Sequence, residues 1–286
     1  MTMRETSGNY RRRKAFNSIF TLATVAATGS ALLALVLILG YVFINGATAI
    51  NLDFFTDLPR PAGQAGGGMG NAIVGSLIVL AIASVIALPL GFFSGIYLSE
   101  FSNTWFADFV RFVIETLAGV PSIVVGIFAF VLIVRPMGTF SAIAGGFALA
   151  VIMIPIFARA AEVALHTVPF SLREASLALG VPVWRTVLRV VVPSAAPGLI
   201  TAFMLAVARA GGETAPLLFT ALGNRWWHDG LTNPIATLPV AIYTYAIGPY
   251  DDWHRQAWAG SLVLVGITIS VIALVRIAFR GASIKQ

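Results

Sequence analysis

The sequence contains no cysteine and very few charged residues. Without cysteine there can be no disulfide, no thiol nucleophile and no thiolate metal site. Charged residues make up 10% of the 286 residues and hydrophobic residues 58%, whereas an ordinary soluble domain is roughly 25% charged. These proportions exclude a soluble globular protein and indicate a chain embedded in lipid.

Patterns that would indicate catalysis are also missing. The glycine-rich stretch GQAGGGMG at 63–70 is not followed by Lys-Ser or Lys-Thr, so it is not a P-loop, and no other stretch supplies one. His166, His228 and His254 are far apart, and none has a second ligand at helical spacing. No Ser-His-Asp elbow is present. We expect neither an ATPase site nor a cofactor in this chain itself.

Long apolar segments recur along the chain. A helix needs about 20 apolar residues to cross a bilayer, and the hydropathy pattern predicts six such spans, near 18–44, 72–98, 109–134, 138–164, 194–221 and 258–279. The fold class expected is therefore all-α, a polytopic transmembrane helical bundle. The first span follows a basic cluster as a signal peptide does, but its apolar stretch is too long, and it reads as a retained peripheral anchor.

The lysines and arginines predict the orientation of these spans. Short basic loops are retained on the cytoplasmic side, and most of the 18 basic residues fall on one side if the N-terminus is inside. The opposite side holds Arg60, Arg135, Arg225 and Arg255. We therefore expect both termini in the cytoplasm. The net charge of +6 is then a topology signal, and nucleic-acid binding is not expected.

The chain divides into three expected regions. Residues 1–17 form a cytoplasmic tail, 18–65 the first helix and an external loop, and 66–286 the main transmembrane domain. Within that domain, a long cytoplasmic loop covers about 165–193 and a long external loop about 222–257. The segment TLPVAIYTYAI in the external loop is too short to span, and it either lies along the interface or dips inward.

The cytoplasmic loop contains signals for a short helix. Ser171 with Glu174 forms a capping-box pattern, and Gly180 followed by Pro182 is expected to end the helix. A turn and a second short helix follow. The apolar side of this unit either packs on its own bundle or is buried by a partner.

The spacing in this loop resembles the EAA motif of the membrane subunits of ABC importers. The residues that carry the resemblance are Glu174, Ala175, Ser176, Gly180 and Pro193. Ser176 replaces an alanine, and two valines replace other aliphatic residues, so size and apolar character are preserved. In that family the motif forms a coupling helix that docks on a separate ATPase subunit. The resemblance thus implies that ATP and Mg²⁺ are bound by a partner.

The segment ARAGGETAPLLF, residues 208–219, places two charges inside an apolar run. Arg209 lies about 18 Å along the fifth span from Pro197, at 1.5 Å per residue. An arginine near the bilayer centre costs roughly 2.5–3.5 kcal/mol. We therefore expect Arg209 to face the bundle interior or a water-filled path.

Two interpretations of Arg209 stay open. Glu213, four residues later, can neutralise it on the same helical face. Alternatively, the guanidinium recognises an anion, since its planar fork of donors fits phosphate or carboxylate oxygens. The two can alternate, with Glu213 holding the arginine when no substrate is present. Gly211, Gly212 and Pro216 weaken the helix beside the pair, as expected of a helix that lines a transport path.

Three stretches resemble the PstA-type permease subunit of phosphate importers. They are ARAGGETAPLLFTAL from residue 208, ETLAGVPSIVVGIF at 115–128, and NPIATLPVAIYTYAIGPYDDWHRQAWAG at 233–260. The similarity extends over most of the chain from about Gly66. It implies a type I ABC importer permease fold in the bacterial plasma membrane. It also implies three partners for phosphate import: a PstC-type permease subunit, a PstB-type ATPase dimer and a PstS-type external phosphate-binding protein.

Some assignments remain alternatives. Pro121 is expected to bend the third span, and the hydroxyls of Ser122 and Thr214 are possible donors to a bound oxyanion. The sequence also leaves open an ABC importer subunit for sulfate, molybdate or a phosphonate. An ATP-independent channel or an intramembrane enzyme is a more distant alternative.

Overall fold

The computed structural model describes residues 3–64 and 66–278, and within these residues the chain is helical with no β-strand. The helices are α1 (Met3–Ala47), α2 (Leu52–Thr56), α3 (Gly70–Glu100), α4 (Trp105–Gly119), α5 (Ser122–Ala129), α6 (Arg135–Met137), α7 (Ala142–His166), α8 (Phe170–Ala178), α9 (Val183–Thr186), α10 (Val192–Gly211), α11 (Ala215–Leu218), α12 (Leu238–Ala246) and α13 (Asp251–Ala278). Two π-helical segments, η1 (Phe130–Val134) and η2 (Val187–Val191), join their neighbours without a break.

The predicted membrane spans are largely found and are corrected in two places. Among the described residues, five helices are long and apolar enough to cross a bilayer, and there are six spans if one bent pair of helices counts as a span. The span predicted at 109–134 is not straight, because Trp105–Gly119 and Ser122–Met137 meet at 103°. The span predicted at 194–221 ends at Gly211, since Gly212 and Thr214 interrupt the helix before α11. Position 279 of the last predicted span lies outside the described residues.

Helices α3 and α7 form the centre of the bundle, where small residues let their backbones approach closely. A Cβ atom on Gly91 would lie 2.7 Å from the Phe157 ring, and one on Gly95 would lie 2.7 Å from Cβ of Ala161. Such small residues are the usual means of close helix packing in lipid, where no hydrophobic effect drives helices together. Helix α7 is accordingly the most enclosed of the spans.

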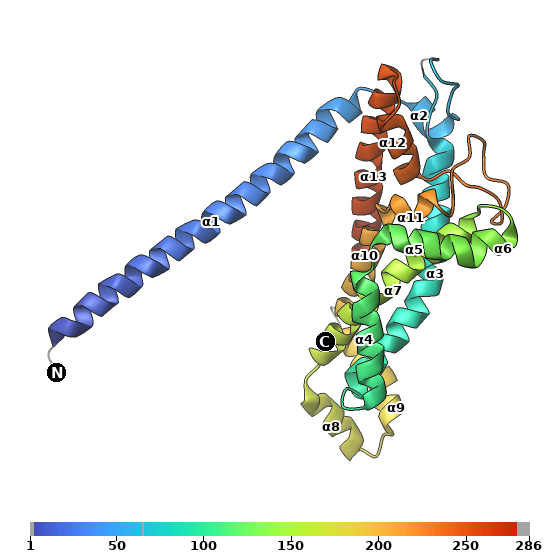
Figure 1. Cartoon of the computed structure of the whole chain (residues 1–286). Helices are drawn as coiled ribbons and strands as arrows, with labels where there is room; N and C mark the ends of the chain where they lie inside the picture. The colour runs from blue at the N-terminus through green and yellow to red at the C-terminus, as the bar shows by residue number, and fades with distance from the viewer. Residues whose placement is uncertain (1–2, 65, 279–286) are drawn as a thin grey trace.

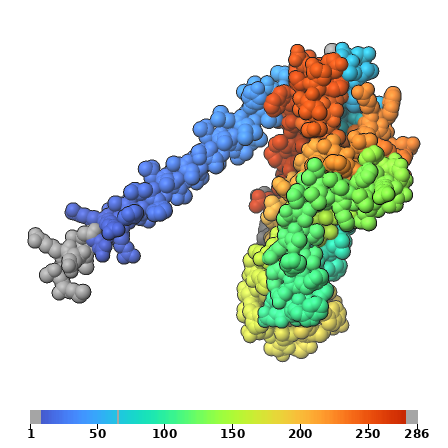
Figure 2. Space-filling view, viewed as in Figure 1, coloured from blue at the N-terminus to red at the C-terminus, as the bar shows by residue number. Residues whose placement is uncertain are grey.

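Helix α1 stands apart from the rest of the molecule. It extends away from the bundle as a single long rod (Figures 1 and 2). It packs on α13 near its end, where Tyr41 meets Trp258 edge to face with ring centroids 5.2 Å apart. Gly46 allows the close approach, because a Cβ there would lie 2.7 Å from the Trp258 carbonyl oxygen. Its assignment as a peripheral anchor remains a prediction.

The end of the bundle that carries α2 is built from segments distant in sequence. Helices α12 and α13 pack side by side there, next to α2 and the start of α3 (Figure 1). The segment TLPVAIYTYAI forms α12, a short helix against α13. The glycines before α3 make a tight turn, because Gly66 and Gly67 have φ of +85° and +84°, and Gly66 N–H donates to Asp252 Oδ2 at 3.2 Å.

Candidate functional site

Arg209 and Glu213 lie at the break between α10 and α11. Arg209 is in the last turn of α10, where a cation is favoured by the helix dipole. Its Nη2 is 3.3 Å from Glu213 Oε1. The Arg209 side chain is 65% exposed, whereas that of Glu213 is 12% exposed. This conformation therefore contains the ion pair between Arg209 and Glu213, which is one of the two interpretations drawn from the sequence. The guanidinium lies on the outer side of the bundle.

The exposed face of α10 explains the position of Arg209. Residues at four-residue spacing form one exposed stripe along this helix, namely Pro193, Pro197, Thr201, Leu205 and Arg209. Ala206, Val207 and Ala210, on the other faces, are buried. Within this chain the guanidinium thus lies on an open surface of the bundle rather than in its interior. Such a surface has to be completed by lipid or by another subunit.

A second helix break adjoins the first. Val120 and Pro121 are both extended, with ψ of 128° and 135°, and Pro121 thus bends the span between α4 and α5, as expected. Helix α5 packs on α11 (Figure 1). Gly126 makes this possible, because a Cβ there would lie 2.7 Å from Pro216 Cα. The two interrupted spans are therefore neighbours about half-way along the bundle.

Ser122 and Thr214 each begin a helix at these breaks. Ser122 is the first residue of α5, and Thr214 precedes α11. Both are half-buried, and neither hydroxyl has a hydrogen-bond partner among the described residues. Their role as donors to a ligand is untested and remains a prediction.

The loop at 165–193 folds as a helix, a turn and a second helix. Gly180 has φ of +77°, and Gly180 N–H and Val181 N–H donate to the carbonyls of Leu177 and Ser176, which ends α8 as expected. The capping prediction for Ser171 is wrong. Pro169 precedes the helix without a side-chain cap, and Ser171 lies inside the first turn. The second helix is not separate, because α9, η2 and α10 form one continuous helix from Val183 to Gly211.

Hydrogen bonds of Arg173 and Ser176 hold α8 in place. Arg173 donates to Glu100 at 2.9 Å, at the end of α3, and also to the carbonyls of Leu165 and Val168. Ser176 and Thr186 share a hydrogen bond of 2.8 Å between buried hydroxyls. Sequence reasoning missed the pairing of Arg173 with Glu100 and of Ser176 with Thr186, since no local pattern pairs residues so far apart.

The motif residues divide between the two sides of this unit. Glu174, Ala175, Gly180 and Pro193 are exposed, whereas Ser176 is buried against Thr186. Large apolar side chains around the turn are also exposed, including Phe170, Leu179 and Trp184. This end of the molecule therefore presents an apolar surface on a rigidly held helix.

A buried carboxylate links two spans near the same end. Glu162 of α7 accepts from Arg159 at 2.6 Å and from Arg111 of α4 at 3.1 Å. A buried charge of this kind is stable only when it is paired. Sequence reasoning used the two arginines for orientation and missed their shared partner, although Arg159 and Glu162 are three residues apart on one helix.

Comparison with known proteins identifies the family. Residues 87–283 match the model of the binding-protein-dependent transport system inner membrane component family. The chain belongs to this family.

The described residues contain no cluster of three or more His, Cys, Asp or Glu that could hold a metal ion.

Named relatives resemble nearly the whole chain. A Yersinia pestis protein described as phosphate transport system permease protein PstA is 41% identical over 280 residues, which cover 98% of this chain and 94% of the relative. A Mycobacterium leprae protein of the same description is 36% identical, over 96% of this chain and 92% of the relative. These matches confirm the resemblance that the sequence motifs suggested.

The fold is also shared with a solved transporter. A chain of the MetNI methionine ABC transporter, in an inward-facing conformation, matches with a TM-score of 0.57 and 21% identity, over 73% of this chain and 93% of that one. The identity is low, so this match bears on the fold alone. It confirms the type I ABC importer permease fold.

Proposed function

We propose that this chain is a membrane-spanning permease subunit of an ATP-driven phosphate importer. It forms half of the translocation path and couples to a separate ATPase. The relatives named as phosphate permeases support the substrate. The observation that carries the proposal is the exposed stripe of α10 that ends in Arg209, beside two adjoining helix breaks. A subunit that lines half a path must be open on the side that faces the other half.

The partner across this face is, on our proposal, a PstC-type permease subunit. A guanidinium on a lipid-facing surface would carry a cost of roughly 2.5–3.5 kcal/mol, and a second subunit removes that cost by enclosing a hydrated path. Arg209 then meets a passing oxyanion with its fork of donors. Glu213 pairs with the guanidinium between transport events. The anion therefore binds to Arg209 only transiently, as conduction requires.

One continuous helix can couple the ATPase to the translocation path. The helix from Val183 to Gly211 begins at the turn after α8 and ends two residues beyond Arg209. Because Arg173 and Ser176 fasten α8 to the bundle, a displacement of α8 by a PstB-type ATPase dimer passes along this helix to the arginine. ATP and Mg²⁺ are bound by that dimer, and a PstS-type protein delivers phosphate from outside.

The exposed end carrying α8 is accordingly the cytoplasmic end. Most lysines and arginines fall near that end on the expected topology, and the apolar residues around the turn provide the docking surface. Both termini are then cytoplasmic, in a bacterial plasma membrane.

Substitution of Arg209 tests the proposal. In cells that depend on this subunit, labelled phosphate uptake by Arg209→Gln is expected to fall about ten- to a hundredfold, the scale of losing a charged hydrogen bond. Arg209→Lys should fall less, since it retains the charge but not the fork. Copurification of the partner subunits should not change. Normal phosphate uptake by Arg209→Gln would refute the proposed role.

A paired substitution separates the two interpretations of the ion pair. If Arg209 and Glu213 merely neutralise each other, the double variant Arg209→Gln/Glu213→Gln should recover the uptake lost by Arg209→Gln. If Arg209 binds the anion, the double variant should stay inactive. Labelled sulfate and molybdate, offered to the unaltered importer in parallel, distinguish phosphate from other oxyanions as the cargo.

A further inference from the structure

A cavity with several polar groups in its lining lies at the end of the bundle opposite α8. It has a volume of about 260 Å³, is open to the outside, and is lined by residues of the loop after Ala221, of α12, and of the ends of α3 and α13. Its polar lining consists of Asn71, Asn224, Arg225, Thr237, Thr244 and Tyr245. None of the residues that line it is an aspartate or a glutamate. The lining thus combines one cation with hydroxyl and amide groups.

The amide groups hold the loop in place. Asn71 Nδ2 donates to the carbonyls of Asn224, at 2.7 Å, and Trp226, at 3.3 Å, which flank Arg225 on both sides. Asn224 Oδ1 in turn accepts from Trp226 N–H at 3.0 Å. The loop turns sharply at Leu222, a non-glycine residue with φ of +60°. A strained backbone that is held by several hydrogen bonds is typical of functional positions.

Three polar groups of the cavity have no hydrogen-bond partner in the part of the chain that the structure describes. Arg225 is exposed, and its side chain makes no ion pair or hydrogen bond within the described residues. The Thr237 hydroxyl is buried, with 1% of the residue exposed, and is unbonded. The Tyr245 hydroxyl is likewise unbonded among the described residues, and the residue is 8% exposed. A fully buried hydroxyl without a partner, as at Thr237, is rare in native structures and calls for a ligand or water.

The Tyr245 hydroxyl is positioned as a donor. Its ring stacks on Trp253, with centroids 4.8 Å apart and planes 7° apart, which fixes the hydroxyl. Burial raises the pKa of Tyr245 above 10.0, Arg225 opposes this effect, and Asp252 adds to it. The hydroxyl therefore stays protonated at neutral pH. Asp252 itself is engaged by Gly66 N–H and by Arg255.

We infer that this cavity is a binding site for a tetrahedral oxyanion. Arg225 supplies the charge, and the hydroxyls of Tyr245 and Thr237 donate to further oxygens. A guanidinium with neutral hydroxyl donors and no carboxylate in the lining is the chemistry that selects an oxyanion over a cation. This inference deepens the proposed function. It takes the identity of the ligand, inorganic phosphate, from that function.

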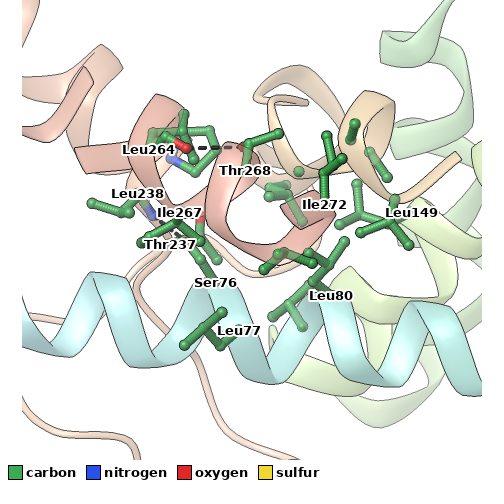
Figure 3. Close-up of a pocket in the computed structure, with 18 residues that line it drawn as sticks. Ser76, Leu77, Leu80, Leu149, Thr237, Leu238, Leu264, Ile267, Thr268 and Ile272 are labelled. Atoms are coloured by element: carbon green, nitrogen blue, oxygen red, sulfur yellow. Dashed lines mark hydrogen bonds between the residues drawn. The ribbon is translucent and has the colours of Figure 1, made fainter. Parts of the chain in front are cut away.

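The space next to the cavity is unsuited to an anion. Below the cavity, Thr237 also lines a small, mostly apolar space of about 30 Å³ between α3, α10 and α13 (Figure 3). Two polar groups there are already bonded, since Ser76 Oγ accepts from Leu238 N–H at 2.7 Å and Thr268 donates to Leu264 O (Figure 3). An anion would lose its hydration in such a space without compensation. The cavity is thus an external waiting site, separate from Arg209.

Phosphate binding to the full-length chain in detergent tests the site. All variants carry Arg209→Gln as a common background, so that Arg209 does not contribute to binding. Binding of labelled inorganic phosphate is measured by equilibrium dialysis. Adding Arg225→Gln is expected to weaken binding about tenfold or more, and adding Tyr245→Phe about three- to tenfold. Tyr245→Phe retains the ring that stacks on Trp253, and Thr237→Val retains the shape, so neither should disturb the fold.

Arg135→Gln is the matched control, because Arg135 is an exposed arginine that does not line the cavity. It should bind phosphate like the background. Competition by sulfate supports the site, and equal competition by chloride contradicts it. Unchanged affinity in Arg225→Gln, or no saturable binding in the background, would overturn the inference. Failure of the proposed function would be seen in a different experiment, as normal phosphate uptake by the Arg209→Gln variant.

Discussion

Ser176 and Thr186 show how a single substitution in a motif is accommodated. The motif that the loop resembles has alanine at the position of Ser176, and the serine places a hydroxyl in a buried position. Thr186, ten residues later, accepts or donates the hydrogen bond at 2.8 Å. The pair joins α8 to α9, so an apparently neutral change in the motif is linked to a distant residue.

We predict that Ser176→Ala destabilises the protein although alanine is the residue of the motif. The Thr186 hydroxyl would be left buried and unpaired, at a cost of about 1–3 kcal/mol. The double variant Ser176→Ala/Thr186→Val should be nearly as stable as the unaltered chain, because it removes both partners. Thermal unfolding in detergent measures this, and equal melting temperatures for the single and double variants would contradict it.

At the scale of the element, the interrupted spans are held together by one glycine. Gly126 of α5 lies against Pro216 and Phe219, and a Cβ there would lie 2.7 Å from the Pro216 Cα and 3.3 Å from the Phe219 ring. The backbone of α11 cannot move aside easily, because Leu217 and Pro216 are buried. The geometry at the end of α10 therefore depends on the absence of a side chain on a different span.

We predict that Gly126→Ala lowers both stability and uptake. Overpacking of this kind costs about 1–3 kcal/mol, and the displacement of α11 would move Thr214 relative to Arg209. Gly119→Ala is the matched control, because a Cβ at that position has no atom within 4 Å. Thermal unfolding and labelled phosphate uptake of both variants give the comparison. If the two variants behave alike, the packing of α5 on α11 does not control the site.

At the scale of the whole molecule, the proposed orientation places the α8 end of the bundle in the cytoplasm. The absence of cysteine makes this directly measurable, because any introduced cysteine is the only thiol in the chain. Leu179 and Trp226 are suitable positions near opposite ends, since they are 83% and 72% exposed.

We predict that Trp226→Cys in intact cells reacts with a membrane-impermeant maleimide and that Leu179→Cys reacts only after permeabilisation. Binding of an ATPase subunit should then protect Leu179→Cys and leave Trp226→Cys unaffected. Labelling of Leu179→Cys from outside would reverse the proposed orientation and remove the docking role of α8.

The sequence predicted the bundle well because lipid imposes strict local rules. A span needs a minimum apolar length, and its backbone must be satisfied within the segment, so the spans near 72–98 and 138–164 are found close to their observed positions. Gly180 was identifiable because a left-handed residue after a helix is a local requirement. The extent of the bend at Pro121 was not predictable, because the packing of α5 on α11 determines it.

The sequence alone therefore determined the apolar spans, the turn at Gly180 and the placement of Arg209 and Glu213 four residues apart. Each of these depends on neighbouring residues in one segment. The tertiary structure decided which face of α10 carries Arg209, which residues fasten α8, and that Arg225 and Tyr245 share a cavity. Those features arise where segments far apart in the sequence come together, and no local periodicity records such contacts.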